Sequence, residues 1–281
     1  MDVAKLAALA SRNGGHCRDS EQGVSIQQGS LPLIAIPTTS GSGSEATPYS
    51  VINSVETGRK FTVTDSSLYP RYALVDPALT LGLPPRFTLA SGLDVWVHLL
   101  EAYLSRQRYS RLDFLIESTS RVVYENLAQA LAQPQNLSAR SHMAESATIA
   151  GMVISQVRTG LIHTLPVALA PFSDLPHGLL NATITPHVLE FNSGENEGRL
   201  CALVETMTDA HVSTDPEAIA TLRHWLEKLG VSPYLSLETA DQRISQMIQR
   251  VRRDKGLPSI NPKPFSDHDL EGLLRGIVEK G

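Results

Sequence analysis

Asp94 and His98 are the first pair of side chains whose types and spacing could do chemistry. They stand four residues apart in a segment with helical periodicity, so they would project from one helix face about one turn apart. That spacing suits two ligands on one cation. Because the neighbouring residues are mostly apolar, an ionised aspartate there needs a partner. A structural hydrogen-bonded pair is the alternative, and the D-x-x-x-H pattern alone does not decide between them.

Two further histidines belong to short motifs that contain glycine. His163 follows Gly160 by three residues, and His177 lies between Pro176 and Gly178. The proline and the second glycine indicate a sharp turn at a helix start, which would aim the side chain into a cleft. Each histidine alone is typical of a buried or capping residue. One carboxylate and three imidazoles together suit Fe(II) or Zn(II) with one position left open, although spacing alone does not assemble the four.

A run of small hydroxyl residues and glycines, T-T-S-G-S-G-S-E, occupies residues 38–45. It directly follows an apolar run at 31–36 that predicts a short strand. Small side chains of this kind let backbone N–H groups approach a phosphate or a nicotinamide closely. The segment is neither a Walker A loop nor a G-x-G-x-x-G fingerprint. Taken by itself, it also fits a flexible Ser/Gly loop.

The elements that must position these residues divide the chain in two. Residues 1–83 predict an α/β portion with a helix at 2–11, a polar Gly-rich connector at 12–29, and short strands at 31–36, 51–52, 60–64 and 72–75. Residues 84–281 predict an all-α portion with helices at 88–105, 109–132, 139–157, 177–192, 216–229 and 239–255, and a last helix after an N-cap at Ser266. We therefore predict an incomplete, Rossmann-like α/β domain over 1–83, which begins with a helix where a doubly wound sheet would open with a strand, and an all-helical domain over 84–281.

The composition is that of an ordinary globular protein, with 42% hydrophobic and 19% charged residues and a formal net charge of −5. Nucleic acid or an anionic membrane as a partner would need a concentrated basic field, which this balance lacks. Cys17 and Cys201 form no C-x-x-C pair and fit a reducing compartment. There is no signal-peptide pattern at the start and no apolar run of about 20 residues. We expect a cytoplasmic protein.

In five motifs the chain resembles the iron-containing (group III) alcohol dehydrogenase family. The family's T-T-x-G-[ST]-x-[SA]-E loop matches residues 38–45, and its later strand and turn match A-L-V-D-P at 73–77 and L-P-P at 83–85. Its first metal motif, G-x-D-x-x-x-H-x-x-E-x-Y, matches residues 92–103. Its second motif, G-x-x-H followed by P-H-G-x-x-N-A, matches 160–163 and 176–182. So many positions in register make a chance resemblance very improbable.

The resemblance implies a dehydroquinate synthase-like fold and an enzyme that interconverts an alcohol and an aldehyde or ketone with NAD or NADP. It implies that Fe²⁺ or Zn²⁺ is held by four residues: Asp94, His98, His163 and His177. It further implies that the cofactor lies beside four others: Thr38, Thr39, Ser42 and Lys60. The expected partners are a small-molecule alcohol or aldehyde and further copies of the chain in a homo-oligomer.

Two departures from the family pattern leave alternatives open. Many members carry a histidine four residues after the third ligand, where this chain has Val167. Members also begin with strands and a G-G-G-S turn for the pyrophosphate, whereas the first residues here resemble the helix after that turn. One alternative is therefore a truncated, catalytically silent metal-binding remnant. Another is a dehydroquinate synthase-like lyase, but Asp94 as first ligand and the few basic residues near the motifs favour the dehydrogenase.

Overall fold

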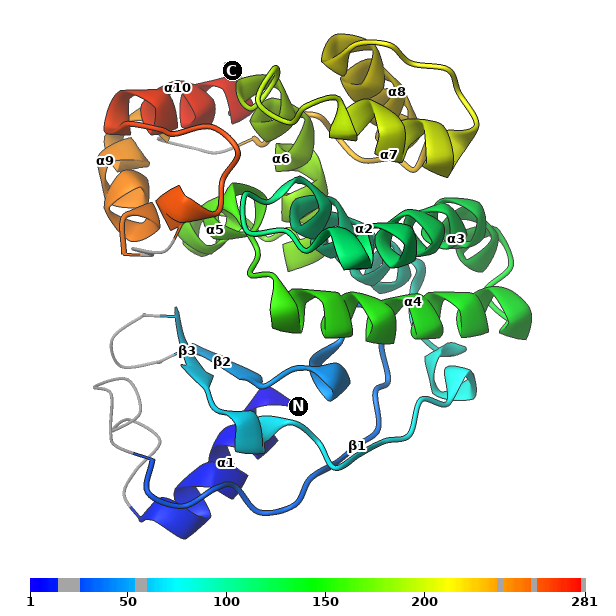
Figure 1. The fold of residues 1–281 in the computed structure, drawn as a ribbon, viewed down its shortest axis with the longest axis vertical. Coiled ribbons are helices and arrows are strands. Elements are labelled where there is room, and N and C mark those ends of the chain that lie inside the picture. The colour runs from blue at the N-terminus through cyan, green and yellow to red at the C-terminus, as the bar shows by residue number, and fades with distance from the viewer. Residues whose placement is uncertain (15–25, 54–59, 237–239, 254–256, 279–281) are drawn as a thin grey trace.

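The computed structural model describes residues 1–14, 26–53, 60–236, 240–253 and 257–278. Figure 1 shows α1 and the strands on one side of helix α4 and the other long helices on the opposite side. The predicted order, an α/β portion followed by helices, is confirmed. The division into separate domains at residue 83 stays a prediction. Most of the connector predicted at 12–29 lies outside the described residues.

The described α/β portion contains α1 (Asp2–Asn13) and two small sheets. Strands β1 (Ile34–Ala35) and β4 (Tyr72–Ala73) pair in parallel, and β2 (Tyr49–Asn53) pairs antiparallel with β3 (Lys60–Thr64). Short 3₁₀ turns complete this portion: η2 (Ser44–Ala46), η3 (Ser66–Leu68) and η4 (Pro77–Thr80).

Two of the predicted strands are shorter than expected. Of the run predicted at 31–36, only Ile34–Ala35 pairs, because Pro32 and Pro37 flank it and lack the N–H that a ladder needs. Its partner β4 is therefore also short and ends at Ala73 rather than at residue 75. The strand predicted at 60–64 is confirmed with both bounds.

A small apolar core holds the α/β portion together. Leu6 and Leu9, three residues apart on α1, are buried against Val63 of β3 and Leu68 of η3. Both leucines lie on the same face of the helix because residues three apart are neighbours on a helix surface. The first helix thus covers the β2–β3 hairpin and stands beside η2.

The helical portion consists of α2 (Pro85–Leu104), α3 (Asp113–Ala132), α4 (Leu137–Gln156), α5 (Leu161–Leu169), α6 (His177–Phe191), α7 (Arg199–Thr208), α8 (Asp215–Lys228), α9 (Ala240–Val251) and α10 (Asp267–Ile277). Short 3₁₀ turns precede or follow some of them: η5 (Ser110–Leu112), η6 (Ala170–Phe172) and η7 (Leu257–Ser259). The predicted helices are confirmed within a few residues at the described ends. Helices α5 and α7 were not predicted from the sequence.

Helix α2 is the centre of the helical portion. Its residues from Leu93 to Leu104 are buried on every side, as expected of a helix that is apolar all round. It packs against α3, α4 and α6, and Trp96 meets Trp225 of α8 edge-on with ring centroids 5.0 Å apart. A polar side chain on α2 is therefore surrounded by packed helices, and its direction is fixed.

Helix starts in this portion follow the local sequence. Thr214 and Glu217 form a capping box at α8, and Ser266 and Asp269 form one at α10, which confirms the predicted N-cap. Pro85 occupies the first turn of α2, where its missing N–H has no helical partner to lose. Within the described residues, no helix has the length and apolar character needed to cross a membrane.

Candidate metal centre and cofactor loop

Three of the four predicted metal ligands lie together in the interior. Asp94 and His98 come from α2, one turn apart, and His163 comes from the first turn of α5. The ligand atoms of the three lie within 4.8 Å of one another, and all three residues are buried. The rings of His98 and His163 stack with centroids 4.4 Å apart. The spacing argument for Asp94 and His98 therefore agrees with the structure, although their role as ligands stays a prediction.

His177, the fourth predicted ligand, lies at the edge of this group. It is the first residue of α6, and its Nε2 is 3.9 Å from Asp94 Oδ1. Its side chain is 40% exposed, in contrast to the buried triad. The next residue, Gly178, allows α6 to approach α2 because a Cβ there would overlap the carbonyl oxygen of Ala90. The Pro-His-Gly turn thus brings His177 to the open side of the cluster.

The buried side chains fit a divalent metal ion. His98 Nδ1 and His163 Nε2 are both buried and have no hydrogen-bond partner. Asp94 Oδ1 lies 3.5 Å from His163 Nε2, which is too long for a good hydrogen bond. Buried polar atoms without a partner are rare and call for an explanation such as a bound ion. A carboxylate with imidazoles is a donor set that both iron and zinc accept.

Glu101 fixes the orientation of His163. Its Oε2 accepts a hydrogen bond from His163 Nδ1 at 2.6 Å and another from the backbone N–H of Gly160 at 2.9 Å. Its Oε1 accepts from the N–H of Ile162 at 2.6 Å. One buried carboxylate on α2 therefore caps the start of α5 and leaves only Nε2 of His163 to face the cluster.

Asn181 orients the carboxylate of Asp94, as Glu101 orients the ring of His163. It is fully buried on α6, one turn after His177, and its Nδ2 donates to Asp94 Oδ1 at 2.8 Å. The same Nδ2 lies 3.3 Å from His177 Nε2. Sequence reasoning assigned a role to neither Asn181 nor Glu101. The available signal was their place inside the two matched motifs.

The electrostatics of the cluster are set by burial and by two carboxylates. Burial lowers the pKa of His98 to about 4. Burial also opposes the charged forms of Asp94 and His163. The neighbouring histidines, His98 first, nevertheless hold the pKa of Asp94 below its ordinary value. The pKa of His163 is raised because the carboxylates of Asp94 and Glu101 lie beside its ring and Glu101 accepts a hydrogen bond from its Nδ1. The two carboxylates thus supply negative charge that stabilises a positive charge between them.

The loop at 38–44 lies directly beside helix α2, which carries Asp94 and His98. The side chains of Thr38, Thr39 and Ser42 are exposed, so their hydroxyls are accessible. Gly41 packs on Ser91 of α2, where an added Cβ would be 2.9 Å from Ser91 Cβ. Ser91 precedes Asp94 by three residues, which is about 5 Å along the helix. The loop and the predicted metal centre are therefore neighbours.

The structure says less about two other positions singled out in the sequence, Lys60 and Val167. Lys60 begins β3, but its side chain lies outside what the structure describes, so its role beside the cofactor stays a prediction. Val167 is half-buried on α5, four residues after His163, and therefore lies on the same helix face one turn further along. At this position the side chain of Val167 is apolar and does not titrate, whereas the histidine of many family members would.

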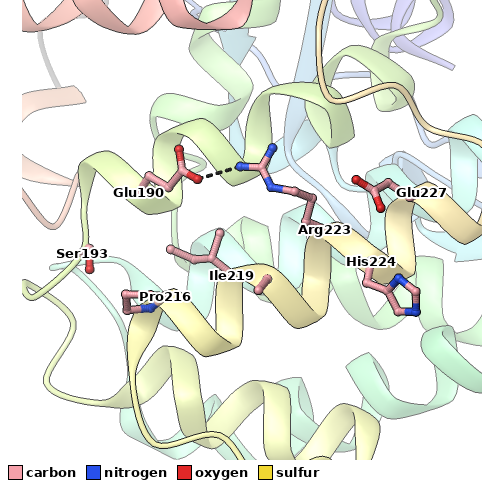
Figure 2. A pocket seen from close by; sticks show the side chains of 8 residues that line it. Glu190, Ser193, Pro216, Ile219, Arg223, His224 and Glu227 are labelled. Carbon is pink, nitrogen blue, oxygen red and sulfur yellow. Dashed lines mark hydrogen bonds and ion pairs between the residues drawn. The ribbon is translucent and has the colours of Figure 1, made fainter.

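A surface hollow of about 340 Å³ lies elsewhere, between the end of α6 and helix α8. Figure 2 shows its lining side chains, among them Glu190 and Arg223, which form an ion pair at 2.6 Å. Glu190 is near the opposite end of α6 from His177, about 20 Å along the helix axis. None of the predicted site residues whose side chains the structure describes lines this hollow.

Comparisons with known proteins agree with the geometry. The sequence profile of the Fe-containing alcohol dehydrogenase family, C-terminal, matches residues 88–278, and the profile named iron-containing alcohol dehydrogenase matches residues 1–77. A 1-propanol dehydrogenase of Citrobacter freundii is 39% identical over 292 residues, covering 99% of this chain and 75% of the relative. A 1,3-propanediol dehydrogenase of Klebsiella pneumoniae is 29% identical, covering 87% of this chain and 64% of the relative.

Solved structures show the same relationship. A sulfoacetaldehyde reductase from Bifidobacterium kashiwanohense in complex with NAD⁺ superposes with a TM-score of 0.89 and 25% identity, covering 100% of this chain and 74% of that one. A 1,3-propanediol oxidoreductase superposes with a TM-score of 0.89 and 27% identity, covering 98% and 74%. The metal motifs, the fold and these relatives lead to one conclusion: the chain belongs to the iron-containing alcohol dehydrogenase family.

Proposed function

We propose that this chain is a metal-dependent oxidoreductase that interconverts a small alcohol and its aldehyde or ketone with a nicotinamide dinucleotide. One observation carries the proposal. A buried group of metal-ligating atoms, all within 4.8 Å of one another, lies one helical turn from an exposed loop of hydroxyl residues and glycines. Hydride transfer requires the nicotinamide to be next to the substrate carbon, and the adjacency of the loop and the buried group supports such an arrangement.

Four residues would hold Fe²⁺ or Zn²⁺ in this proposal: Asp94, His98, His163 and His177. The bound ion supplies Lewis-acid stabilisation of negative charge on a substrate oxygen. The chain's own contribution is to orient the donors. Glu101 holds the ring of His163, and Asn181 holds the carboxylate of Asp94. The half-exposed His177 lies on the side from which substrate would enter.

The cofactor would lie along the loop at 38–44, with its nicotinamide near the hydroxyls of Thr38, Thr39 and Ser42. Their exposure and the contact between Gly41 and Ser91 support this assignment. Lys60 remains a proposed neighbour of the cofactor. The structural neighbour solved with NAD⁺ supports NAD as a cofactor of this chain, and the titration below compares it with NADP.

The substrate class follows from the relatives and from one side chain. Two relatives are named for 1-propanol and 1,3-propanediol, and a structural neighbour is named for an aldehyde. Val167 adds an apolar surface one turn from His163. A short primary alcohol and its aldehyde therefore fit best. Family membership favours this reaction over the dehydroquinate synthase-like lyase.

We further propose that the chain forms a homo-oligomer in the cytoplasm. Light scattering can test the oligomeric state, and fractionation of the native cell can test the location.

The deciding experiment is calorimetric titration of the metal-loaded chain with NAD⁺ and NADP⁺, with metal content assayed on the same sample. We expect stoichiometric metal and cofactor binding, followed by turnover of 1-propanol. His177→Ala should lose metal and turnover while helical content is retained. His268→Ala, at an exposed position on α10, is the matched control and should lose neither. Bound metal without cofactor binding would instead support the catalytically silent metal-binding protein.

A further inference from the structure

Lys5 is the least expected buried residue of the α/β portion. It lies on α1, it is 2% exposed, and it is among the largest fully buried side chains of the protein. Lysine is almost never fully buried unless its charge has partners, because removing an ammonium from water is costly. The ammonium of Lys5 must therefore be stabilised by the groups around it.

Those groups are backbone carbonyls from one short segment. Lys5 Nζ donates to Ser44 O at 2.6 Å, to Thr47 O at 2.7 Å and to Tyr49 O at 3.0 Å. The Thr47 hydroxyl oxygen lies within 3.3 Å as well. An ammonium has three N–H donors, so three converging carbonyls match it in number. Without the cation these converging carbonyl dipoles would repel one another and lose their charged donor.

The start of α1 makes further contacts with the same segment. Asp2 accepts a hydrogen bond from the Ser44 hydroxyl at 2.9 Å through its carboxylate, and one from the Ser50 hydroxyl at 2.8 Å through its carbonyl. The segment from Ser44 to Ser50 is thus attached to α1 by both a charged side chain and a helix terminus. Figure 1 shows α1 on the side of this segment away from α4.

This segment is the direct continuation of the loop that presents Thr38, Thr39 and Ser42. On its other side, Gly43 takes a positive φ of 59° and lies against Gly151 of α4 so closely that a Cβ on Gly151 would overlap Gly43 O. The end of the loop is therefore held between α4 and the ammonium of Lys5.

We propose that Lys5 is a positioning residue for the cofactor: its ammonium fixes the end of the 38–44 loop so that the loop presents one arrangement of hydroxyls to the dinucleotide. Among the described residues, the ammonium of Lys5 bonds to backbone carbonyls and to one hydroxyl, so we assign it a positioning role rather than a part in the chemistry. The inference rests on the proposed function, since it assigns cofactor binding to this loop. The requirement is for three N–H donors on one atom at this point, which no neutral side chain supplies.

The test compares Lys5→Met with the wild type in the metal-loaded protein. Methionine keeps the length of the side chain but removes the charge and all three donors. We expect the Kd for NAD⁺, measured by calorimetry, to rise at least tenfold while metal content and the Kd for the metal stay unchanged. Lys228→Met, at an exposed site near the end of α8, is the matched control and should bind NAD⁺ like the wild type.

A second variant tests the ammonium itself and remains informative if Lys5→Met does not fold. Lys5→Ala leaves space for a small amine, so n-propylammonium should restore the NAD⁺ affinity toward the wild-type value. Tetramethylammonium, which carries the charge but no N–H donors, should not. A purely structural role would lower metal and cofactor binding together, without this difference between the two cations.

The outcomes separate this inference from the proposed function. Wild-type affinity for NAD⁺ in Lys5→Met, or equal effects of the two cations on Lys5→Ala, would overturn the positioning role while the dehydrogenase proposal stands. Failure of the metal-loaded wild type to bind NAD⁺ would overturn both. Weak NAD⁺ binding that only the N–H-donating cation restores would support the inference.

Discussion

Glu101 determines which nitrogen of His163 is available to a metal ion. Because a carboxylate accepts only, the hydrogen bond at 2.6 Å requires the proton of His163 to be on Nδ1. Nε2, which is buried and has no hydrogen-bond partner, is then the atom that faces Asp94 and His98. Such carboxylate–histidine pairs fix the orientation and raise the basicity of a metal ligand.

Replacing Glu101 with glutamine should weaken metal binding without removing a ligand. The amide has nearly the same shape, but its N–H₂ group must face one of the donors that Glu101 now accepts from. We expect the metal Kd to rise about 10- to 100-fold, measured by competition with a coloured chelator. Glu145→Gln, at an exposed position on α4, is the matched control. An unchanged Kd in Glu101→Gln would show that orientation of His163 does not depend on this carboxylate.

The buried charge of Lys5 should make the free energy of unfolding increase as the pH rises. Burial lowers the pKa of Lys5 from 10.5 to about 8, although Asp2 and Glu45 act in the opposite direction. Between these two values the unfolded chain binds more protons than the folded one, so the free energy of unfolding rises with pH. Below about pH 8 the cost of the buried charge is fully present.

The measurement is urea unfolding of the wild type and of Lys5→Met at several pH values from 7 to 10.5. Methionine does not titrate, so the difference in unfolding free energy between the two proteins isolates Lys5. We expect the wild type to gain stability relative to the variant as pH rises through this window. A constant difference would mean that the pKa of Lys5 is the same in the folded and unfolded chains.

For individual residues, the sequence predicts which side chains are neighbours within one helix better than which are neighbours between different helices. The four-residue spacing of Asp94 and His98 was sufficient to place them on one face of α2. Glu101 and His163 are 62 positions apart, and Asn181 and Asp94 are 87 apart. Such pairs depend on how α5 and α6 pack on α2, which no local pattern contains. Only the resemblance to a family connected His163 and His177 with the first pair.

Helix α4 and the loop at 38–44 meet through two glycines, and this contact leaves no space for a larger residue. A Cβ on Gly151 would overlap the carbonyl of Gly43, whose own positive φ of 59° already favours glycine. The buried Glu45 accepts a hydrogen bond from Thr148 at 2.8 Å, one turn before Gly151. The loop is thus positioned by a face of α4 as well as by α1.

Gly151→Ala should therefore displace the loop from α4. We expect a loss of about 1–3 kcal/mol in unfolding free energy, as for other overpacked sites, together with weaker NAD⁺ binding and unchanged metal content. Gly272→Ala on α10 is the control, since nothing lies within 4 Å of its Cβ position. This control should gain about 0.5–1 kcal/mol from helix propensity. An equal gain in Gly151→Ala would contradict the close approach.

The elements missed by the sequence share a physical reason. Helix α5 has only nine residues and contains Pro166, and α7 has ten residues bounded by Gly198 and Asp209 in positive φ. Short helices of this kind owe their stability to packing, here against α6 and α9 or against α3 and α8. The 20-residue helices α2, α3 and α4, with long runs of apolar spacing, were predicted. Length and periodicity decide what the sequence can predict, and tertiary contacts decide the rest.

Over the whole molecule, the candidate metal centre joins helices that are far apart in sequence. Its residues come from α2, from the start of α5 and from the start of α6. A ligand that binds only the folded chain stabilises it by about 2.7 kcal/mol at a concentration 100 times its Kd. Since 1 kcal/mol corresponds to about 2–4 °C in a chain of this size, metal should raise the unfolding temperature by roughly 5–10 °C.

Scanning calorimetry with and without Fe²⁺ or Zn²⁺ measures this shift, and variants assign it to the site. His177→Ala removes the proposed metal ligand of α6, so the shift should shrink. The metal-free variant should unfold near the wild-type temperature, because His177 is partly exposed and Asn181 still bonds α6 to Asp94. His268→Ala should keep the full shift. If metal raises the unfolding temperature of His177→Ala as much as that of the wild type, the metal centre is limited to α2 and α5. In that case Asp94, His98 and His163 would hold the ion, and α6 would only cover it.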